Sequence, residues 1–244
     1  MSESDWFEDW FDTKYYHILY KNRNDEEAKQ FVHGLIDQLQ LKPGMKLLDL
    51  ACGKGRHSKT LHDLGYDVLG VDLSKSSISD AQKWASHQLS FQVHDMREVI
   101  PNRSFDVIFN LFTSFGYFDS SVDNERMCLS ISKMLEPGGR LVIDFMNARK
   151  VIESLVLKEQ KTIQGVTFDI SRRFDGMHIY KEIRIEDKSH NAQYTERVQA
   201  LDLADFHVLL EPYFEIESVF GSLDLEPFEV RDSDRLIIIA SRKK

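Results

Sequence analysis

The sequence predicts an α/β protein built on a doubly wound, largely parallel sheet. Between residues 45 and 147, short apolar runs alternate with segments of helical periodicity, and a glycine-rich turn joins the first run to the first helix. The runs are mostly apolar along their length and do not alternate with polar residues. Such strands require parallel pairing, because the crossover helices then cover both faces of the sheet.

Five strands and three helices are expected in this region, in alternation along the chain. The strands are residues 45–50, 67–71, 89–93, 105–111 and 140–145, and the helices are 57–64, 76–87 and 123–135. Gly65 is suited to end the first helix because glycine tolerates positive φ. Pro137-Gly138-Gly139 is expected to turn the chain into the fifth strand.

The residues before this region, 1–44, are expected to form a helical cap. Apolar residues at three- and four-residue spacing from Ala28 to Leu39 indicate an amphipathic helix with Asp25 as its N-cap. Aromatic residues crowd the preceding stretch: Trp6, Phe7, Trp10, Phe11, Tyr15, Tyr16 and Tyr20. Two interpretations stay open, since these rings could pack the segment onto the core or face a ligand.

After about residue 157 the hydrophobic period becomes two, which predicts an antiparallel insert over 158–201. Its three expected strands are 163–170, 178–187 and 193–201, and its cations are expected on a solvated strand face: Arg172, Arg173, Lys181 and Arg184. Helical spacing returns from Leu203 to Tyr213, and strands 214–220 and 236–240 should pair as a hairpin. The chain is thus expected to be one domain, 1–244, with its core in 45–157 and 202–244.

Composition excludes several classes of protein. The 31 basic and 40 acidic residues give a net charge of −9, which argues against a surface for nucleic acid or anionic lipid. The first residues lack the pattern of a signal peptide, and no apolar run approaches the ~20 residues of a membrane span, so a cytoplasmic protein is expected. Cys52 and Cys128 should be reduced thiols, and the nine histidines show no metal-ligand spacing.

The turn after the first strand carries the most informative residues. Gly53 and Gly55 would let the backbone approach a ligand closely, although two glycines alone would equally suit a dinucleotide. Two details argue against that ligand: Ser58 follows where a third glycine is absent, and Asp49 stands at the strand end. A carboxylate there would repel a pyrophosphate and suits a ligand with an ammonium and no phosphate, such as S-adenosylmethionine.

Two further carboxylates follow the next two strands. Asp72 lies 19 residues after Gly53 at the end of strand two, where a carboxylate can accept both ribose hydroxyls. Its alternative role, a helix cap, is already available to Ser74 or Ser76. Asp95, after strand three, can accept from an adenine amino group while the next backbone N–H donates to the ring. Carboxyl ends of parallel strands are where open α/β sheets bind ligands.

These residues resemble the motifs of the class I S-adenosylmethionine-dependent methyltransferases. Residues 49–55 match the glycine-rich motif, Asp72 the acidic motif, Asp95-Met96 the adenine motif, and residues 135–139 the turn before strand five. The resemblance covers about residues 46–147. It implies a Rossmann-like sheet of seven strands, the last antiparallel, with S-adenosyl-L-methionine as the cofactor.

Within this family, residues 105–117 and an antiparallel insert after strand five look like the small-molecule N-methyltransferases of the amino-sugar and glycine type. The resemblance implies cofactor contacts from Tyr15, Tyr20, Arg23, Asp49, Ala51, Cys52, Gly53, Gly55, Arg56, His57, Asp72, Leu73, Ser74, Asp95, Met96, Arg97, Asn110 and Leu111. The sequence departs from the family at Arg56-His57, where many members have small residues, so a side chain there would crowd or contact the methionine end. A tyrosine or Arg23 would reach the methionine carboxylate.

Four polar residues after strand four are expected to orient the acceptor: Asn110, Thr113, Ser114 and Tyr117. A neutral amine needs no base before it attacks the methyl group, so none of them is expected to be a nucleophile. The surrounding phenylalanines are expected to be core or pocket wall. Both the cap and the insert should lie above the carboxyl ends of the core strands.

Three functions remain in competition. The first is transfer of a methyl group to a small molecule, with an amine as the favoured acceptor. The second is an RNA or protein methyltransferase, which the net charge and the residues Leu111-Phe112-Thr113 after Asn110 disfavour for nucleic acid. The third is a non-catalytic cofactor-binding module. No nucleic-acid, membrane or metal partner is expected, and a free edge of the insert would allow a homodimer.

Overall fold

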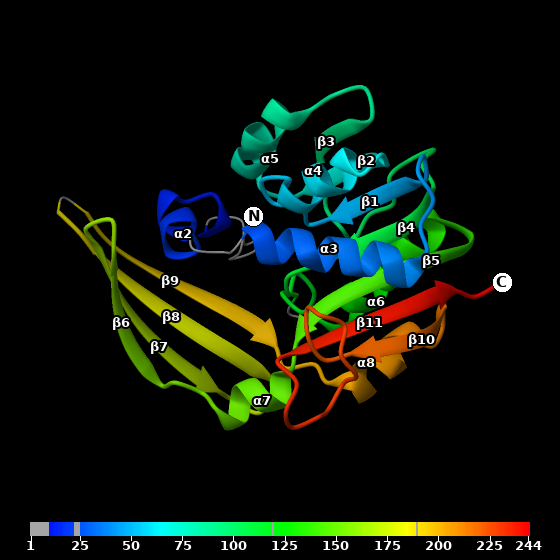
Figure 1. Cartoon of the computed structure of the whole chain (residues 1–244). Coiled ribbons are helices and arrows are strands. Elements are labelled where there is room, and N and C mark those ends of the chain that lie inside the picture. The colour runs from blue at the N-terminus through cyan, green and yellow to red at the C-terminus, as the bar shows by residue number, and fades with distance from the viewer. Residues whose placement is uncertain (1–9, 22–24, 119, 189) are drawn as a thin grey trace.

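Two β-sheets organise the computed structural model, which describes residues 10–21, 25–118, 120–188 and 190–244 (Figure 1). The core sheet has seven strands in the order β10-β11-β5-β4-β1-β2-β3, and the insert sheet has four in the order β6-β7-β8-β9. Trp6, Phe7 and Arg23 lie outside the described residues, so the roles expected for them stay predictions.

The core sheet confirms the predicted fold class. Its strands are β1 (Lys46–Leu50), β2 (Asp67–Asp72), β3 (Leu89–Val93), β4 (Phe105–Asn110), β5 (Leu135–Met146), β10 (Phe214–Phe220) and β11 (Arg235–Arg242). Strand β1 pairs in parallel with β2 and β4, whereas β11 runs antiparallel to both β5 and β10. The expected final pair is therefore present, although the long connection 221–234 joins its strands.

Helices cover both faces of this sheet. They are α3 (Asp25–Leu39), α4 (Arg56–Asp63), α5 (Lys75–Ala81), the 3₁₀ turn η1 (Gln82–Trp84), α6 (Ser121–Met134) and α8 (Leu203–Leu210), whereas the short helix α7 (Ala148–Glu153) follows β5 beside the insert sheet (Figure 1). In β1, Leu47 belongs to a cluster with α3 and α4, whereas Leu48 and Leu50 belong to a second cluster with α6 and α8. Burial on both faces explains why the strand runs are apolar throughout.

Some element boundaries differ from those predicted. Helix 76–87 stops at Ala81 and continues only as η1, because Ser86 already donates its N–H to Leu89. Asp25 is the first residue of α3 and not its cap. The Pro137-Gly138-Gly139 turn lies inside β5 as a register shift, between the pairs Phe105 with Leu135 and Val107 with Arg140.

The insert sheet has four strands where three were predicted: β6 (Lys158–Ile163), β7 (Val166–Phe174), β8 (His178–Asp187) and β9 (His190–Gln199). The prediction of one strand over 163–170 was wrong because a tight turn interrupts it. Gln164 and Gly165 have φ of 53° and 81°, the left-handed pair of a two-residue hairpin loop. All pairings in this sheet are antiparallel, as expected.

The short helix α2 (Lys14–Leu19) lies between the insert sheet and α5 (Figure 1). Trp10 and Tyr15 are buried against Phe168 and Ile183 of the insert sheet, in a third hydrophobic cluster. Of the residues expected to form a cap, α2 thus packs on the insert, whereas α3 packs on the core sheet. No helix among the described residues is long and apolar enough to cross a membrane.

Candidate cofactor and acceptor site

A cavity of about 380 Å³ opens at the carboxyl ends of β1, β2, β3 and β4. Parallel α/β sheets bind ligands at this edge. The glycine loop forms one wall, the residues after β2 and β3 form the second, and the loop after β4 forms the third. Residues of α2 and its flanks close the cavity from the side of the insert.

The glycine loop holds its shape through backbone hydrogen bonds. Cys52 donates its N–H to Val71 O at 2.9 Å, and Gly55 donates to Cys52 O at 3.0 Å. Ala51, Gly53 and Gly55 have φ of 66°, 55° and 76°, so the chain reverses sharply before α4 begins. Burial raises the pKa of the Cys52 thiol well above its usual range, which keeps it protonated and unsuited to nucleophilic attack.

Asp49 lies beneath this loop with 1 % of its surface exposed. The Ser58 hydroxyl donates to Asp49 Oδ2 at 2.6 Å. Burial raises the pKa of Asp49 to about 6, although its hydrogen bonds with Ser58 oppose that rise. A cationic ligand in the cavity would favour the ionised form of this carboxyl.

Asp72 ties the end of β2 to both adjoining loops. Its Oδ2 accepts from Gly53 N–H and its Oδ1 accepts from Ser74 N–H, each at 2.8 Å. Burial raises its pKa, and the two backbone donors offset part of that rise. Each oxygen can accept a further hydrogen bond, so the carboxylate can still receive a pair of ligand hydroxyls. Ser74 caps α5 and also donates to Asp12, which explains why its side chain does not line the cavity.

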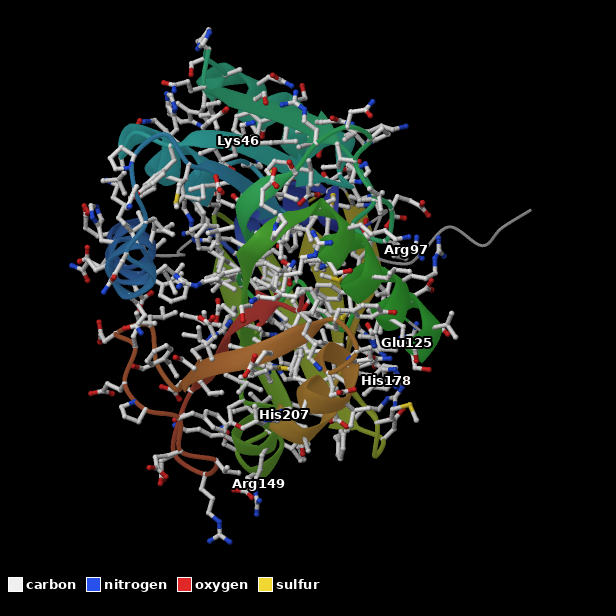
Figure 2. The ribbon with its side chains drawn as sticks, turned by 90° about the vertical axis from the view of Figure 1, so that its right-hand side faces the viewer. Lys46, Arg97, Glu125, Arg149, His178 and His207 are labelled. Carbon is white, nitrogen blue, oxygen red and sulfur yellow. The ribbon has the colours of Figure 1, made fainter. Side chains whose placement is uncertain are left out.

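Asp95 is engaged by its neighbour Arg97. The Arg97 Nε lies 3.0 Å from both carboxylate oxygens, and Arg97 Nη2 lies 2.6 Å from Asp95 Oδ2. These contacts hold the pKa of Asp95 low despite its partial burial. Arg97 also reaches Asp123 at 3.5 Å, and Figure 2 shows it beside the end of α6 that carries Glu125. An adenine amino group at Asp95 would therefore share the carboxylate with Arg97.

The loop after β4 has an unusual backbone. Phe112 and Thr113 have φ of 67° and 61°, a conformation that costs roughly 1–2 kcal/mol for each residue with a side chain. The Phe112 N–H donates to Asp144 Oδ2 and the Thr113 N–H donates to Asp144 O, both at 2.8 Å. Arg235 Nε lies 2.7 Å from Asp144 Oδ1, and Arg235 Nη2 lies 3.2 Å from the Thr113 hydroxyl.

Asn110 and Thr113 do not line the cavity. Asn110 is fully buried, and its Nδ2 donates to Leu50 O at 3.0 Å, which ties β4 to β1. The Thr113 hydroxyl accepts from Arg235 on the side away from the cavity wall. Ser114 and Tyr117 do line it, and the Tyr117 ring contacts Phe11 edge to face with centroids 5.5 Å apart.

Tyr20 connects the cavity to the insert. Its hydroxyl lies 2.7 Å from both oxygens of Glu196, and Lys181 Nζ donates to it at 2.5 Å. Because the phenol O–H donates its hydrogen bond to Glu196, it is not directed at a methionine carboxylate in this structure. Trp10 Nε1 donates to the same carboxylate at 2.7 Å. The insert sheet thus anchors the aromatic wall of the cavity.

The expectation that the insert cations form a solvated face was wrong for Lys181 and Arg172. Only 15 % of the Lys181 side chain is exposed, and it lies 3.5 Å from Glu196. Arg172 pairs with Glu159 on the same inner face. Side chains two residues apart in a strand point to the same face of the sheet. Arg172 therefore lies on the face of buried Ile170, and Lys181 on the face of buried Ile183. Arg173 and Arg184 are exposed, as predicted.

Most residues expected to contact the cofactor or acceptor do meet at the cavity. Those that line it are Tyr20, Ala51, Cys52, Gly53, Arg56, His57, Asp72, Leu73, Asp95, Met96, Arg97, Leu111, Ser114 and Tyr117. Those that do not are Tyr15, Asp49, Gly55, Ser74, Asn110 and Thr113. Tyr15 is directed away, since its hydroxyl reaches Asp187 of the insert at 3.2 Å.

Sequence reasoning missed six lining residues: His17, Lys21, Lys54, Ser77, His94 and Phe118. It left Phe11 and Tyr16 open between packing and ligand contact and gave Phe112 as core or pocket wall, and all three line the cavity. Phe11 and Tyr16 belong to the aromatic stretch, and Phe112 belongs to the segment assigned to core or wall, so their neighbourhoods carried a signal. His17 and Lys21 carried none, because their positions depend on where α2 docks. Among the described residues, no group of three or more His, Cys, Asp or Glu could hold a metal ion.

Comparison with known proteins agrees with this geometry. A family model described as "Methyltransferase domain" matches residues 41–197, more than half of the chain. The chain therefore belongs to this methyltransferase family. Its class is that of the S-adenosylmethionine-dependent methyltransferases, for which S-adenosylmethionine is the cofactor.

Individual relatives resemble parts of the chain. The sequence is 33 % identical over 111 residues to the "Putative methyltransferase YqeM" of Bacillus subtilis, which is 44 % of this chain and 45 % of that protein. It is 32 % identical over 98 residues to the dTDP-3-amino-3,4,6-trideoxy-alpha-D-glucopyranose N,N-dimethyltransferase of Streptomyces venezuelae, 40 % of this chain and 41 % of that protein. The matches thus span less than half the length of these relatives.

A solved structure shares nearly the whole architecture. An S-adenosylmethionine-dependent methyltransferase from Clostridium acetobutylicum superposes with a TM-score of 0.77 over 93 % of this chain and 95 % of that one, at 21 % identity. At this identity the likeness concerns the fold, including the insert after strand five.

Proposed function

We propose that this protein transfers a methyl group from S-adenosylmethionine to a small-molecule amine. One observation supports this most directly: a single cavity joins the glycine loop and Asp72 to an aromatic wall made of Phe11, Tyr20 and Tyr117. The first part suits a nucleoside with a cationic end. The second part offers apolar rings and few polar groups, which suits a small-molecule acceptor.

The residues present fit the cofactor. Asp72 would accept the ribose hydroxyls, since its oxygens keep lone pairs beyond those used by Gly53 and Ser74. Asp95 and Met96 would meet the adenine ring. The backbone of Ala51 and Gly53 would approach the methionine portion, where buried Asp49 favours positive charge. Arg56 and His57 line the same side of the cavity and would contact the methionine end.

S-adenosylmethionine supplies an activated methyl group on a sulfonium. The protein's task is then to hold the accepting nitrogen in line with that group and to exclude water. Tyr117 and Ser114 would orient the acceptor, and the rings of Phe11 and Tyr20 would exclude water from it. The supporting contacts of Tyr20 come from Glu196 and Lys181, which fix this side of the wall.

The relative from Streptomyces venezuelae, whose name specifies an amino-sugar N,N-dimethyltransferase, supports an amine as the acceptor. Relatives of similar identity are named ubiquinone biosynthesis O-methyltransferases, which is why the test below includes hydroxy analogues. The net charge of −9 disfavours a nucleic acid. A neutral amine also needs no general base before it attacks the methyl group, so the proposal requires no dedicated base in the cavity.

The test is a methyl-transfer assay that quantifies the demethylated cofactor. It compares a panel of amino sugars and short amines with matched hydroxy analogues, total RNA and a protein extract. We expect turnover with an amine, unaffected by chelator or nuclease. Turnover only with RNA or protein would reject the small-molecule acceptor, whereas cofactor binding with no turnover on any acceptor would favour a binding module.

A further inference from the structure

We infer that Asp144 and Arg235 are positioning residues for methyl transfer, because they hold the strained Phe112-Thr113 segment that forms one wall of the cavity. The inference rests on the proposed function. Neither residue lines the cavity, and they lie 91 positions apart in the sequence on β5 and β11.

The segment they hold is strained at two consecutive residues. Phe112 and Thr113 both have left-handed φ although neither is glycine. Such conformations persist only where the surroundings enforce them, and they gather at functional sites. Between β4 and α6 this pair directly precedes Ser114 and Tyr117, so its conformation decides where those side chains stand.

Asp144 supplies the enforcement through both its side chain and its backbone. Its Oδ2 accepts from Phe112 N–H and its carbonyl accepts from Thr113 N–H, which satisfies the two consecutive amides. Its Oδ1 receives Arg235, at 2.7 Å from Nε and 2.6 Å from Nη2. Arg235 also donates to the Thr113 hydroxyl. The Asp144–Arg235 pair therefore holds both the backbone amides of this segment and the Thr113 side chain.

The Phe112 ring is the part of this segment that lines the cavity, so the ion pair fixes a cavity wall through it. It is 38 % exposed and lines the cavity, and two cations lie near it, with the Arg235 guanidinium 5.9 Å and the Arg56 guanidinium 5.5 Å from its centroid. His57 approaches the same ring at 6.4 Å. The ring thus connects the buried pair to the glycine loop, across the place where the methionine end would lie.

A purely stabilising role would not require this pair. Asp144 is completely buried as a side chain, and a buried ion pair is weak evidence for stability because desolvation offsets its attraction. An apolar pair at these positions could pack the sheet equally well. It could not accept a hydrogen bond from the Phe112 amide or donate one to the Thr113 hydroxyl. We therefore assign the ion pair to holding this segment in place.

The first experiment needs no ligand. In Asp144→Asn the amide oxygen can accept a hydrogen bond from either Phe112 or Arg235. The NH₂ group then faces the other donor and cannot accept from it, so one of the two hydrogen bonds is lost. We expect hydrogen exchange at the Phe112 amide, whose acceptor is the altered side chain, to accelerate more than about tenfold in this variant. Glu217→Gln is the control, because it removes a carboxylate from an ion pair with Arg140, which lies in the middle of β5 and away from the Phe112-Thr113 segment. Unchanged exchange in folded Asp144→Asn would overturn the inference.

The second experiment follows the bound methyl group. The methyl resonance of [methyl-¹³C]S-adenosylmethionine should shift on binding, because aromatic rings surround its site. We expect it to move back toward the free position in Asp144→Asn and Arg235→Gln, partly in Arg235→Lys, and not at all in Glu217→Gln. S-adenosylhomocysteine should still bind to all four within about threefold, since the ribose and adenine contacts are elsewhere.

The outcomes separate this inference from the proposed function. If the wild-type protein binds no S-adenosylmethionine, the proposed function is wrong, and so is the positioning role inferred from it. If the wild type binds and the resonance stays unchanged in the folded Asp144 and Arg235 variants, only the positioning role is overturned. Should Asp144→Asn fail to fold, Arg235→Lys, which keeps the positive charge, decides by the same measurement.

Discussion

Gly53 and Gly55 stand two residues apart in the same loop, and both have positive φ, yet an added methyl group would meet different surroundings. At Gly55 a Cβ would lie 2.5 Å from Phe91 Cε1 and 3.2 Å from Ala81 Cβ. At Gly53 it would meet nothing within 4 Å. The sequence pattern treats the two glycines alike, whereas the structure assigns Gly55 to core packing and Gly53 to the open side of the loop.

We therefore predict that one alanine variant mainly loses stability and the other mainly loses cofactor binding. Gly55→Ala should lower the free energy of unfolding by about 2–4 kcal/mol, because it combines left-handed strain with overpacking against a core ring. Gly53→Ala should cost only about 1–2 kcal/mol of stability, yet weaken S-adenosylmethionine binding more than about tenfold. Urea denaturation and titration calorimetry measure the two effects. Equal losses of stability would contradict this division.

Asp49 gives a prediction for pH dependence. Its pKa of about 6 in the folded protein lies above its ordinary value of 3.8, because burial penalises the charge. The folded protein therefore binds this proton more tightly than the unfolded chain. The resulting stability is fully present below about pH 4 and is lost as pH rises through 6, a change of roughly 3 kcal/mol.

Asp49→Asn should abolish this contribution. The free energy of unfolding of the variant, minus that of the wild type, should rise by about 3 kcal/mol between pH 4 and pH 7. Taking the difference cancels most of the contribution of Asp72, whose pKa is also raised, and leaves the Asp49 contribution together with its electrostatic coupling to Asp72. A difference that stays constant across this range would show that Asp49 is ionised in the folded protein throughout.

At the scale of elements, the core strands could be predicted because burial on both faces leaves a continuous apolar run. Strand β6 could not, since four of its six residues are exposed, none is buried, and its sequence, Lys158–Ile163, shows no alternation. The turn at Gln164-Gly165 was also missed, although Ile163 is out of phase with the alternation of Val166, Phe168 and Ile170 and so marks a break in the pattern. Helix α2 has only six residues, and its position follows from tertiary contacts with the insert.

Two tyrosines of the α2 segment provide a matched test of its role. Tyr20 lines the cavity and bonds Glu196, whereas Tyr15 is buried and bonds Asp187 away from it. Tyr20→Phe should slow methyl transfer by about tenfold, because it removes a hydrogen bond to a charged group beside the site. Tyr15→Phe should leave the rate within about twofold. Equal rates for both variants would mean that α2 serves packing alone.

For the whole molecule, the cavity depends on how the insert sheet meets the core. Gln199 of β9 donates its N–H to Gly116 O at 2.8 Å, which fixes the insert next to the loop after β4. The carboxylates Asp72 and Asp95 could be predicted from sequence because strand ends carry a local pattern. Asp144, Arg235, Glu196 and Lys181 could not, because each acquires its role from a partner more than 30 residues away.

Oligomeric state is a further property of the whole molecule. Strand β6 forms an edge of the insert sheet, with one neighbour, β7. A second subunit could pair there, so a homodimer stays a prediction that light scattering after gel filtration would decide.

The central claim is that the cavity binds S-adenosylmethionine as a methyl donor, with Asp72 on the ribose. Titration calorimetry of the wild type, Asp72→Ala and Asp67→Ala tests it most directly, since Asp67 lies at the opposite end of the same strand. We predict one site for S-adenosylmethionine and S-adenosylhomocysteine, weakened about 10- to 100-fold by Asp72→Ala and unchanged by Asp67→Ala. Tight binding of NADH with no binding of either methyl-donor species would contradict the account.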